Sequence, residues 1–185
     1  MNARMTTRIV GAAGMVGLGV IAGLALGQAR RLATKAAMRL TGDWERQMKA
    51  EHRALIKLTR SLADARIEEA PKRAALVSAV EDLLARHAME EENVVYPALR
   101  AAGLESAVAA QLQDHADMRL LLRELEGMPP EAPGFADAAG KLKDLIDQHI
   151  RQEEHDLFPR LREGAAEGDT VRLTHLVRRE GMRVS

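Results

Sequence analysis

A fourteen-residue pattern occurs twice in this chain, as HAMEEENVVYPALR at residues 87–100 and as HIRQEEHDLFPRLR at residues 149–162. Each copy begins with histidine, has glutamate four and five residues later, and reaches an aromatic residue followed by proline. On an α-helix, positions i and i+4 lie one turn apart on the same face. The pattern therefore places an imidazole beside a carboxylate on each of two similar helices, and the fold must allow these helices to meet.

A second repeated feature precedes each copy, a stretch that carries one histidine directly after an acidic residue. His52 lies in EHRALIKL and His115 lies in DHADMRLL. The separation from this histidine to the following pattern is 35 residues in the first half and 34 in the second. We therefore interpret the body of the chain as two helical hairpins about a pseudo-twofold axis, which would bring four histidines and two glutamates together.

Helical periodicity and composition both favour an all-α fold. Hydrophobic residues make up 46% of the chain but aromatic residues only 2%, so aliphatic side chains have to fill the core. Alanine, leucine, arginine and glutamate are abundant, and all four favour helix. We expect an up-down-up-down four-helix bundle with helices over residues 43–66, 71–103, 104–126 and 135–163, and a short amphipathic helix over 168–181.

The repeated histidines and glutamates predict a metal site. A lone histidine, or one histidine–glutamate pair on a helix, is common without metal, but two matched copies indicate a dinuclear site of the kind that bundles build from facing helices. The candidate ligands are His52, His87, Glu91, His115, His149 and Glu153. Imidazoles with bridging carboxylates suit two non-haem iron ions, with manganese or zinc as alternatives. Six ligands leave coordination positions open for a small molecule.

The other polar and aromatic residues of the repeat are expected to support this site or the packing. Three further carboxylates should lie on a solvated face or orient the imidazoles: Glu90, Glu92 and Glu154. Two histidines are not expected to be ligands: His155 and His175. Tyr96 and Phe158 should pack at one end of the bundle rather than take part in redox chemistry.

Residues 9–28, IVGAAGMVGLGVIAGLALGQ, carry no charge. About 20 helical residues span roughly 30 Å, the thickness of a bilayer's hydrocarbon core, so we expect a single-pass membrane anchor. The excess of basic residues after this segment would keep the following domain in the cytoplasm. A cleaved signal peptide, which would make the protein periplasmic or secreted, and a buried apolar helix are the alternatives. Glycines at positions 19, 23 and 27 form a small face that could support a homo-oligomer.

These features divide the chain into three parts. Residues 1–42 are expected to be a membrane anchor with a basic juxtamembrane segment, residues 43–165 the bundle, and residues 166–185 a short helix and tail. The 27 basic and 27 acidic residues give no net charge, which argues against a nucleic-acid partner. The chain has no cysteine, which excludes disulfides, thiol catalysis and cysteine-ligated zinc.

With these motifs the chain resembles the hemerythrin-like, HHE-type cation-binding family over roughly residues 43–165. The resemblance rests on Glu51-His52, His87 with Glu91-Glu92 and Tyr96-Pro97, Asp114-His115, and His149 with Glu153-Glu154 and Phe158-Pro159. It implies a four-helix bundle whose non-haem di-iron centre, at the six candidate ligands, binds O2 and in some members NO or peroxide. Oxygen-carrying hemerythrins have a further histidine one turn after the third-helix histidine, where this chain has Arg119. That departure moves the expectation from oxygen carriage towards the four-histidine relatives, which include sensors and stress proteins.

Three functions are consistent with the sequence. The first is a membrane-anchored di-iron protein that binds or senses a small diatomic ligand, O2 or NO. The second is an enzyme that uses the same centre for peroxide or NO reduction or for iron–sulfur repair. We favour it less because no cysteine, flavin motif or haem motif is present to deliver electrons. The third is a structural protein of a membrane assembly that holds no metal.

Overall fold

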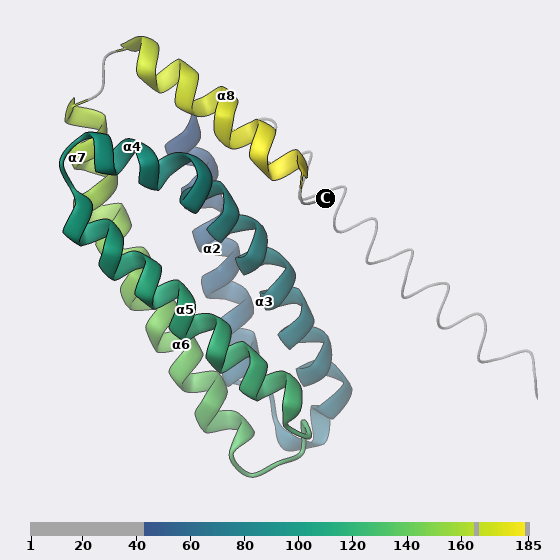
Figure 1. The fold of residues 1–185 in the computed structure, drawn as a ribbon. Coiled ribbons are helices and arrows are strands. Elements are labelled where there is room, and N and C mark those ends of the chain that lie inside the picture. The colour runs from purple at the N-terminus through teal and green to yellow at the C-terminus, as the bar shows by residue number, and fades with distance from the viewer. Residues whose placement is uncertain (1–42, 165–166, 184–185) are drawn as a thin grey trace, which may run out of the picture. The chain divides into compact units, whose positions relative to one another are not determined.

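The computed structural model describes residues 43–164 and 167–183, and every regular element in these ranges is a helix. Four long helices form an antiparallel bundle, and one more helix lies across one end of it (Figure 1). The bundle helices are α2 (Trp44–Ala63), α3 (Ala70–Glu90), α5 (Glu105–Gly127) and α6 (Phe135–Gln152). The helix across the end is α8 (Glu167–Arg183). The short 3₁₀ turn η1 (Ile67–Glu69) leads into α3.

Helices α3 and α6 each continue through one wide turn into a short final segment. The wide turns are the π-helical segments η2 (Glu91–Val95) and η3 (Glu153–Leu157), followed by α4 (Tyr96–Ala101) and α7 (Phe158–Gly164). In each wide turn a backbone N–H donates to the carbonyl five residues earlier, from Tyr96 to Glu91 and from Phe158 to Glu153. A proline follows each time, and proline has no N–H and clashes with the carbonyl four residues before it. We therefore attribute the π turns to the aromatic-proline pairs of the repeat.

Local sequence fixes several helix ends. The Asp43 side chain accepts a hydrogen bond from the Arg46 N–H at 3.0 Å and caps the start of α2. Gly103 ends α4 with a φ of 82°, a left-handed conformation that glycine adopts without a steric penalty. The N–H of Leu104 then bonds to the carbonyl of Leu99, and the N–H of Gly103 bonds to that of Arg100. These two bonds form a Schellman motif, which satisfies the last carbonyls of the helix.

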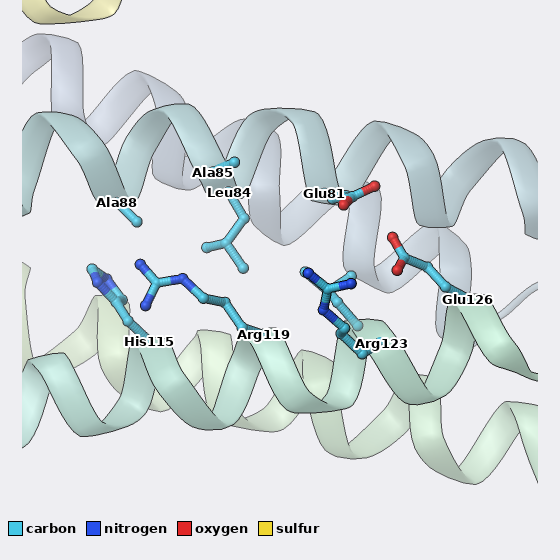
Figure 2. A pocket seen from close by; sticks show the side chains of 9 residues that line it. Glu81, Leu84, Ala85, Ala88, His115, Arg119, Arg123 and Glu126 are labelled. Carbon is cyan, nitrogen blue, oxygen red and sulfur yellow. The ribbon is translucent and has the colours of Figure 1, made fainter. Parts of the chain in front are cut away.

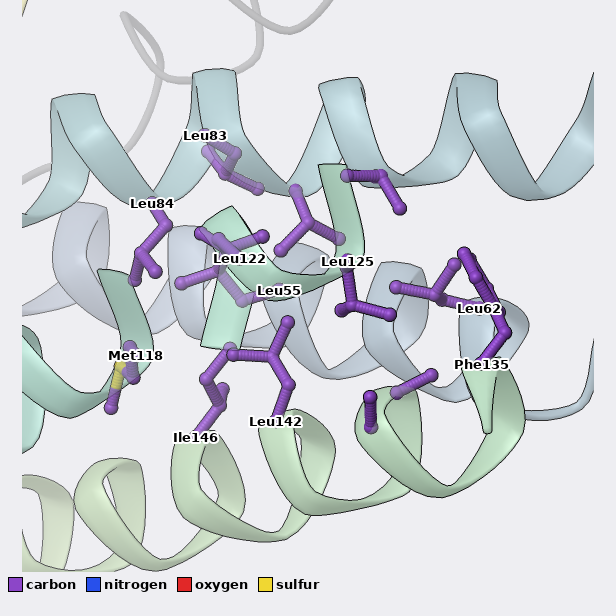
Figure 3. Packing of buried hydrophobic residues seen from close by; sticks show 14 of the residues in the cluster. Leu55, Leu62, Leu83, Leu84, Met118, Leu122, Leu125, Phe135, Leu142 and Ile146 are labelled. Atoms are coloured by element: carbon purple, nitrogen blue, oxygen red, sulfur yellow. The ribbon is translucent and has the colours of Figure 1, made fainter. Parts of the chain in front are cut away.

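Two buried apolar clusters fill the bundle. The first lies towards the α5–α6 connection and contains Leu55, Leu84, Leu122, Leu142 and Ile146 among others (Figure 3). The second lies towards α8 and contains Trp44, Met48, Tyr96, Phe158 and Val177 among others. Along each bundle helix, the histidine of the repeat lies between residues of the two clusters. The polar centre is therefore enclosed by apolar packing on both sides.

Helix α8 closes the end of the bundle at which the second cluster lies. Leu173 and Val177 are buried in this cluster. The backbone N–H of Trp44, at the start of α2, donates to Thr174 Oγ1 at 3.1 Å. The Asn93 side chain in η2 donates to Glu180 Oε1 at 3.0 Å. These bonds join α8 to the first hairpin beside the π turn.

The predicted helices are confirmed, including the short amphipathic helix near the C-terminus, which is observed as α8. The two π turns were not predicted from the sequence. The expected membrane span at residues 9–28 lies outside the described residues. Within residues 43–164 and 167–183, no helix is both long and apolar enough to cross a bilayer.

The bond between Thr174 and Trp44 gives a test of how α8 contributes to stability. Thr174→Val keeps the side-chain volume but leaves a buried N–H without an acceptor, which costs about 1–3 kcal/mol. We expect the free energy of unfolding, measured by urea denaturation, to fall by an amount in this range. Ser61→Ala, which removes only a solvent-exposed bond within α2, is the matched control and should have little effect. Equal stability of the Thr174→Val variant and the wild type would contradict the proposed role of this bond.

Candidate metal centre

Six side chains meet in the bundle interior between the two core clusters. One histidine comes from each of α2, α3, α5 and α6, and each π turn contributes its first residue, a glutamate. They are the six residues that the sequence predicted as ligands: His52, His87, Glu91, His115, His149 and Glu153. None is more than 1% exposed. Local spacing predicted the pairs within each helix, and the packing of the hairpins brings the pairs together.

A partly buried glutamate from the opposite hairpin orients each of two imidazoles. The Nδ1 atom of His52 lies 2.7 Å from Glu154 Oε1, and the Nδ1 atom of His115 lies 2.8 Å from Glu92 Oε1. Each glutamate directly follows a candidate ligand in the sequence. The hydrogen bond that Nδ1–H donates fixes the ring orientation and leaves Nε2 facing the centre. Glu92 and Glu154 thus have the orienting role that was one of their two expected roles.

The other two imidazoles face the acidic residue that precedes the single histidine of their own hairpin. His87 Nδ1 lies 3.0 Å from Glu51 Oε2, and His149 Nδ1 lies 3.6 Å from Asp114 Oδ2. The first distance is a hydrogen bond, whereas the second is too long for one. All four imidazoles therefore have a carboxylate on the Nδ1 side. The acid-histidine pairs in the sequence were the signal for this arrangement, although the sequence did not show which histidine each acid would meet.

Glu91 lies between the two pairs of histidines. Its Oε1 atom is 3.1 Å from His87 Nε2 and 3.8 Å from His52 Nε2. Its Oε2 atom is 3.2 Å from His115 Nε2 and 3.9 Å from His149 Nε2. One carboxylate thus directs one oxygen to each pair, which is the geometry that a bridging ligand requires.

Glu153 occupies a less symmetrical position. Its Oε2 atom is 3.2 Å from His52 Nε2 and 3.5 Å from His149 Nε2. Its Oε1 atom accepts a hydrogen bond from the Tyr96 hydroxyl at 2.9 Å. The second carboxylate therefore also reaches both halves, but one of its oxygens is held by a tyrosine.

Tyr96 and Phe158 form equivalent walls of the centre. The Phe158 ring stacks on His52 with centroids 5.7 Å apart, and the Tyr96 ring stacks on His115 with centroids 5.6 Å apart. Only Tyr96 adds a hydroxyl, and burial together with the charges of Glu153 and Glu91 raises its pKa well above the usual value, so it remains a donor. Tyr96 packs in the second core cluster at one end of the bundle, as predicted, and its hydroxyl in addition bonds directly to a candidate ligand.

The enclosed carboxylates keep the imidazoles protonated when no metal is bound. Burial alone would lower the pKa of His52, but the neighbouring carboxylates of Glu153 and Glu154 outweigh it and raise this pKa to about 9. Burial would also lower the pKa of His149, but the negative charge of Glu153 outweighs burial and raises this pKa to about 10. Burial would raise the pKa of Glu91, but the neighbouring histidines hold it well below its usual range. The metal-free centre is therefore a network of imidazolium and carboxylate groups.

The arrangement fits metal ions. Four buried atoms that face the centre have no hydrogen-bond partner: Nε2 of His52, Nε2 of His87, Oε1 of Glu91 and Oε2 of Glu153. These atoms lie close together in pairs, 3.1 Å apart for His87 Nε2 and Glu91 Oε1 and 3.2 Å apart for His52 Nε2 and Glu153 Oε2, but they do not have hydrogen-bond geometry. Buried polar atoms in folded proteins normally form hydrogen bonds, so this group suits a shared cation. The candidate ligand atoms also fall into two sets whose members lie within 4.8 Å of one another: His52, His87, Glu91 and Glu153, and Glu91, His115 and His149. A cation in each set would satisfy these atoms.

Several neighbouring residues lie at positions that the sequence did not predict. Glu90 is not on a solvated face, because it is 1% exposed and accepts a hydrogen bond from Gln47 at 2.9 Å. The Oε1 atom of Glu90 also lies so close to Gly181 of α8 that a Cβ atom at position 181 would be 2.2 Å from it. Burial and the charge of Glu51 raise the pKa of Glu90 to about 8. Gln111, one turn before a candidate ligand, is fully buried with both amide atoms unpaired. No periodicity signal distinguishes these two from ordinary polar helix residues.

Two histidines lie apart from the centre: His155 and His175, both exposed. The sequence predicted that neither of them is a ligand. Neither belongs to the two candidate ligand sets in the described part of the chain.

Comparison with known proteins gives a consistent result for the fold. The family model described as the hemerythrin HHE cation binding domain matches residues 45–161. The chain is similar to the crystal structure of a hemerythrin HHE cation binding domain-containing protein from Mycobacterium kansasii, with a TM-score of 0.68 and 22% identity. The match covers 78% of this chain and 88% of that one. At this level of identity, the similarity shows the fold alone.

A curated relative matches a shorter part of the chain. A DNA nickase of Nostoc sp. (strain PCC 7120 / SAG 25.82 / UTEX 2576) is 33% identical over 87 residues. The match covers 47% of this chain but only 25% of the nickase. This chain therefore spans about a quarter of that relative's length, and the activity named for the whole relative is not assigned to it.

The protonated imidazoles predict how the stability of the metal-free protein depends on pH. The pKa values of His52 and His149 rise from 6.5 to about 9 and about 10, so the folded state binds protons more tightly than the unfolded chain. This contribution is fully present below about pH 6.5 and is lost as the pH rises through 9 and 10. For chelator-treated protein, the free energy of unfolding from urea denaturation should fall between pH 7 and pH 10. Metal-loaded protein, whose imidazoles would bind metal rather than protons, is the control and should not show this fall. A flat profile for the metal-free protein would contradict the prediction.

Proposed function

This chain belongs to the hemerythrin HHE cation-binding domain family, and from that premise we propose that its enclosed centre holds two non-haem iron ions and binds a small ligand such as O2 or NO. The family match supports cation binding, and the two sets of ligand atoms support its location. The observation that carries the proposal is the group of buried, inward-facing nitrogen and oxygen atoms without hydrogen-bond partners.

Each hairpin half would contribute one pair of imidazoles to one ion. His52 and His87 would hold the first ion and His115 and His149 the second, with Glu91 bridging the two. The placement of the Glu91 oxygens supports this division, because Oε1 is 3.1 Å from His87 Nε2 and Oε2 is 3.2 Å from His115 Nε2. Glu153 would be the second shared carboxylate. We prefer iron because imidazoles and carboxylates without thiolate suit it, although manganese or zinc would accept the same donors.

The residues around these donors would prepare the centre for metal and ligand. The Nδ1-side carboxylates hold the ring orientation and increase the basicity of the ligating nitrogens. Tyr96 provides a hydroxyl donor at one side of the centre only. Bound iron would supply open coordination positions, because six side chains do not fill the coordination shells of two ions. Binding or sensing of a small molecule is therefore the function that this arrangement supports best.

We also propose that residues 9–28 anchor this domain to a membrane, with the domain in the cytoplasm and the glycine face available for self-association. The support comes from the sequence alone, an uncharged segment of bilayer-spanning length followed by basic residues. Carbonate washing of membranes that contain the full chain tests this proposal. Retention in the membrane pellet is expected, and release into the supernatant would refute a spanning helix.

Metal analysis of the purified full chain tests the proposed centre directly. We expect about two iron ions per chain, as in other carboxylate-bridged bundle sites. His115→Ala and Glu153→Ala should each lose iron, because each removes a donor from a buried set. His175→Ala, a substitution at an exposed histidine, is the matched control and should retain the wild-type iron content. Wild-type iron content in both centre variants would refute the assignment.

Tyr96→Phe tests how the chain tunes the centre without removing a donor. The substitution makes the first half resemble the second, in which Phe158 occupies the equivalent position. We expect iron to remain bound but with affinity reduced by about 10–100-fold, because the hydroxyl that orients Glu153 is lost. Competition with a chelator measures this affinity. Unchanged affinity would show that the hydrogen bond does not tune metal binding, and complete loss of iron would show a larger structural role for the hydroxyl.

A further inference from the structure

The two seams between the hairpins are not equivalent, although the pseudo-twofold axis relates them. One seam lies between α2 and α6, and the other lies between α3 and α5. Helices α2 and α6 pack closely along their length, whereas α3 and α5 make far fewer contacts. Within the hairpins, by contrast, α2 with α3 and α5 with α6 pack to the same extent. Among the contacts between the four bundle helices, the departure from symmetry is therefore confined to the α3–α5 seam.

Two substitutions between the halves explain the looser seam. The residue directly after the first histidine of the fourteen-residue repeat is Ile150 in α6 but Ala88 in α3. The residue one turn after the histidine of the other helix, His52 or His115, is Ile56 in α2 but Arg119 in α5. Ile150 is part of the first core cluster, and Ile56 packs against it. Ala88 is too small to fill the matching space, and the Arg119 side chain is 52% exposed rather than packed inside.

A groove of about 210 Å³ occupies this seam, and the candidate ligand His115 is one of the residues that line it. Figure 2 shows its lining, with Ala85, Ala88 and Leu84 on α3 and Arg119 on α5, and with His115 at one end. The groove is large enough for several molecules the size of water, which occupies about 30 Å³ in the liquid, and smaller than the 300–1,000 Å³ typical of organic ligand sites. Its size fits a molecule of a few atoms.

Arg119 lies beside His115 in the lining of the groove. Its side chain reaches towards His115 and Ala88 (Figure 2). Its guanidinium pairs with the carboxylate of Glu92, which also accepts a hydrogen bond from His115 Nδ1. The arginine is half exposed, and exposed side chains change rotamer within nanoseconds. It can therefore cover the His115 end of the groove and move aside without a change in the bundle.

We propose that the groove between α3 and α5 is the path by which a ligand of two or three heavy atoms reaches the metal centre, and that Arg119 covers its His115 end. The inference rests on the proposed function, because it assumes metal at His115. It adds the route of entry and the residue that limits the rate of passage. A residue on the route alters how fast the ligand enters and leaves by the same factor and leaves the equilibrium affinity unchanged.

Stopped-flow binding of azide to the iron-loaded full chain, followed by absorbance, tests the route. Ala85→Trp places a bulky side chain over the groove from an exposed position, so folding should not be affected. We expect the association and dissociation rate constants both to fall, by about tenfold or more, with unchanged Kd and iron content. Ala75→Trp, at an exposed alanine of the same helix that does not line the groove, is the matched control and should bind as the wild type does. Arg119→Ala should raise both rate constants.

The outcomes separate this inference from the proposed function. If Ala85→Trp leaves both rate constants at the wild-type values, the ligand enters elsewhere and the inference is refuted, while the metal centre stands. If iron-loaded wild-type protein does not bind azide, the groove is not a ligand route and only cation binding survives. If the wild-type protein takes up no iron, both proposals fail. A change in Kd, produced by unequal changes in the two rate constants, would make the groove part of the binding site rather than a path.

Discussion

The compensation of buried charge is the constraint on which the rest of this structure depends. An ionised group without a partner in a protein interior costs several kcal/mol, yet this bundle encloses four imidazoles and several carboxylates in its centre. Each imidazole has a carboxylate on its Nδ1 side, and its Nε2 atom lies near Glu91, Glu153 or both. Without metal, protons on the imidazoles balance the charge. With metal, cations would take that role, which is why the centre suits a cation better than an apolar ligand.

The π turns join the local sequence to this centre. Pro97 and Pro159 cannot continue the regular hydrogen-bond ladder, and the wide turn before each begins at the glutamate that faces the histidines. A single turn therefore places the carboxylate, ends the long helix and positions an aromatic wall. Similar bulges are frequent at functional sites in other helices. The proline has no metal chemistry of its own, but it follows directly on the turn that places the carboxylate.

The pseudo-twofold relation is kept where charge must be balanced and broken where it need not be. The imidazoles, the Nδ1-side carboxylates and the two stacked rings all occur in both halves. Tyr96 and Phe158 differ by one hydroxyl, and the two seams differ by Ile150 against Ala88 and by Ile56 against Arg119. These differences give the two sides of the centre unequal hydrogen bonding and unequal access. A symmetrical scaffold thus has an asymmetrical environment without any change in its candidate ligands.

The sequence by itself determined the helices, the pairing of halves and the six residues that meet in the centre. It could do so because each signal is local, a spacing of four residues on one helix or a proline that interrupts a ladder. It did not determine that His87 faces Glu51, that the Tyr96 hydroxyl reaches Glu153, that Glu90 is buried under α8, or that Ala88 leaves the α3–α5 seam open. Only the tertiary structure decided these contacts, because they depend on how far neighbouring helices are rotated and separated. Those quantities follow from packing across the whole bundle and not from the periodicity of any single segment.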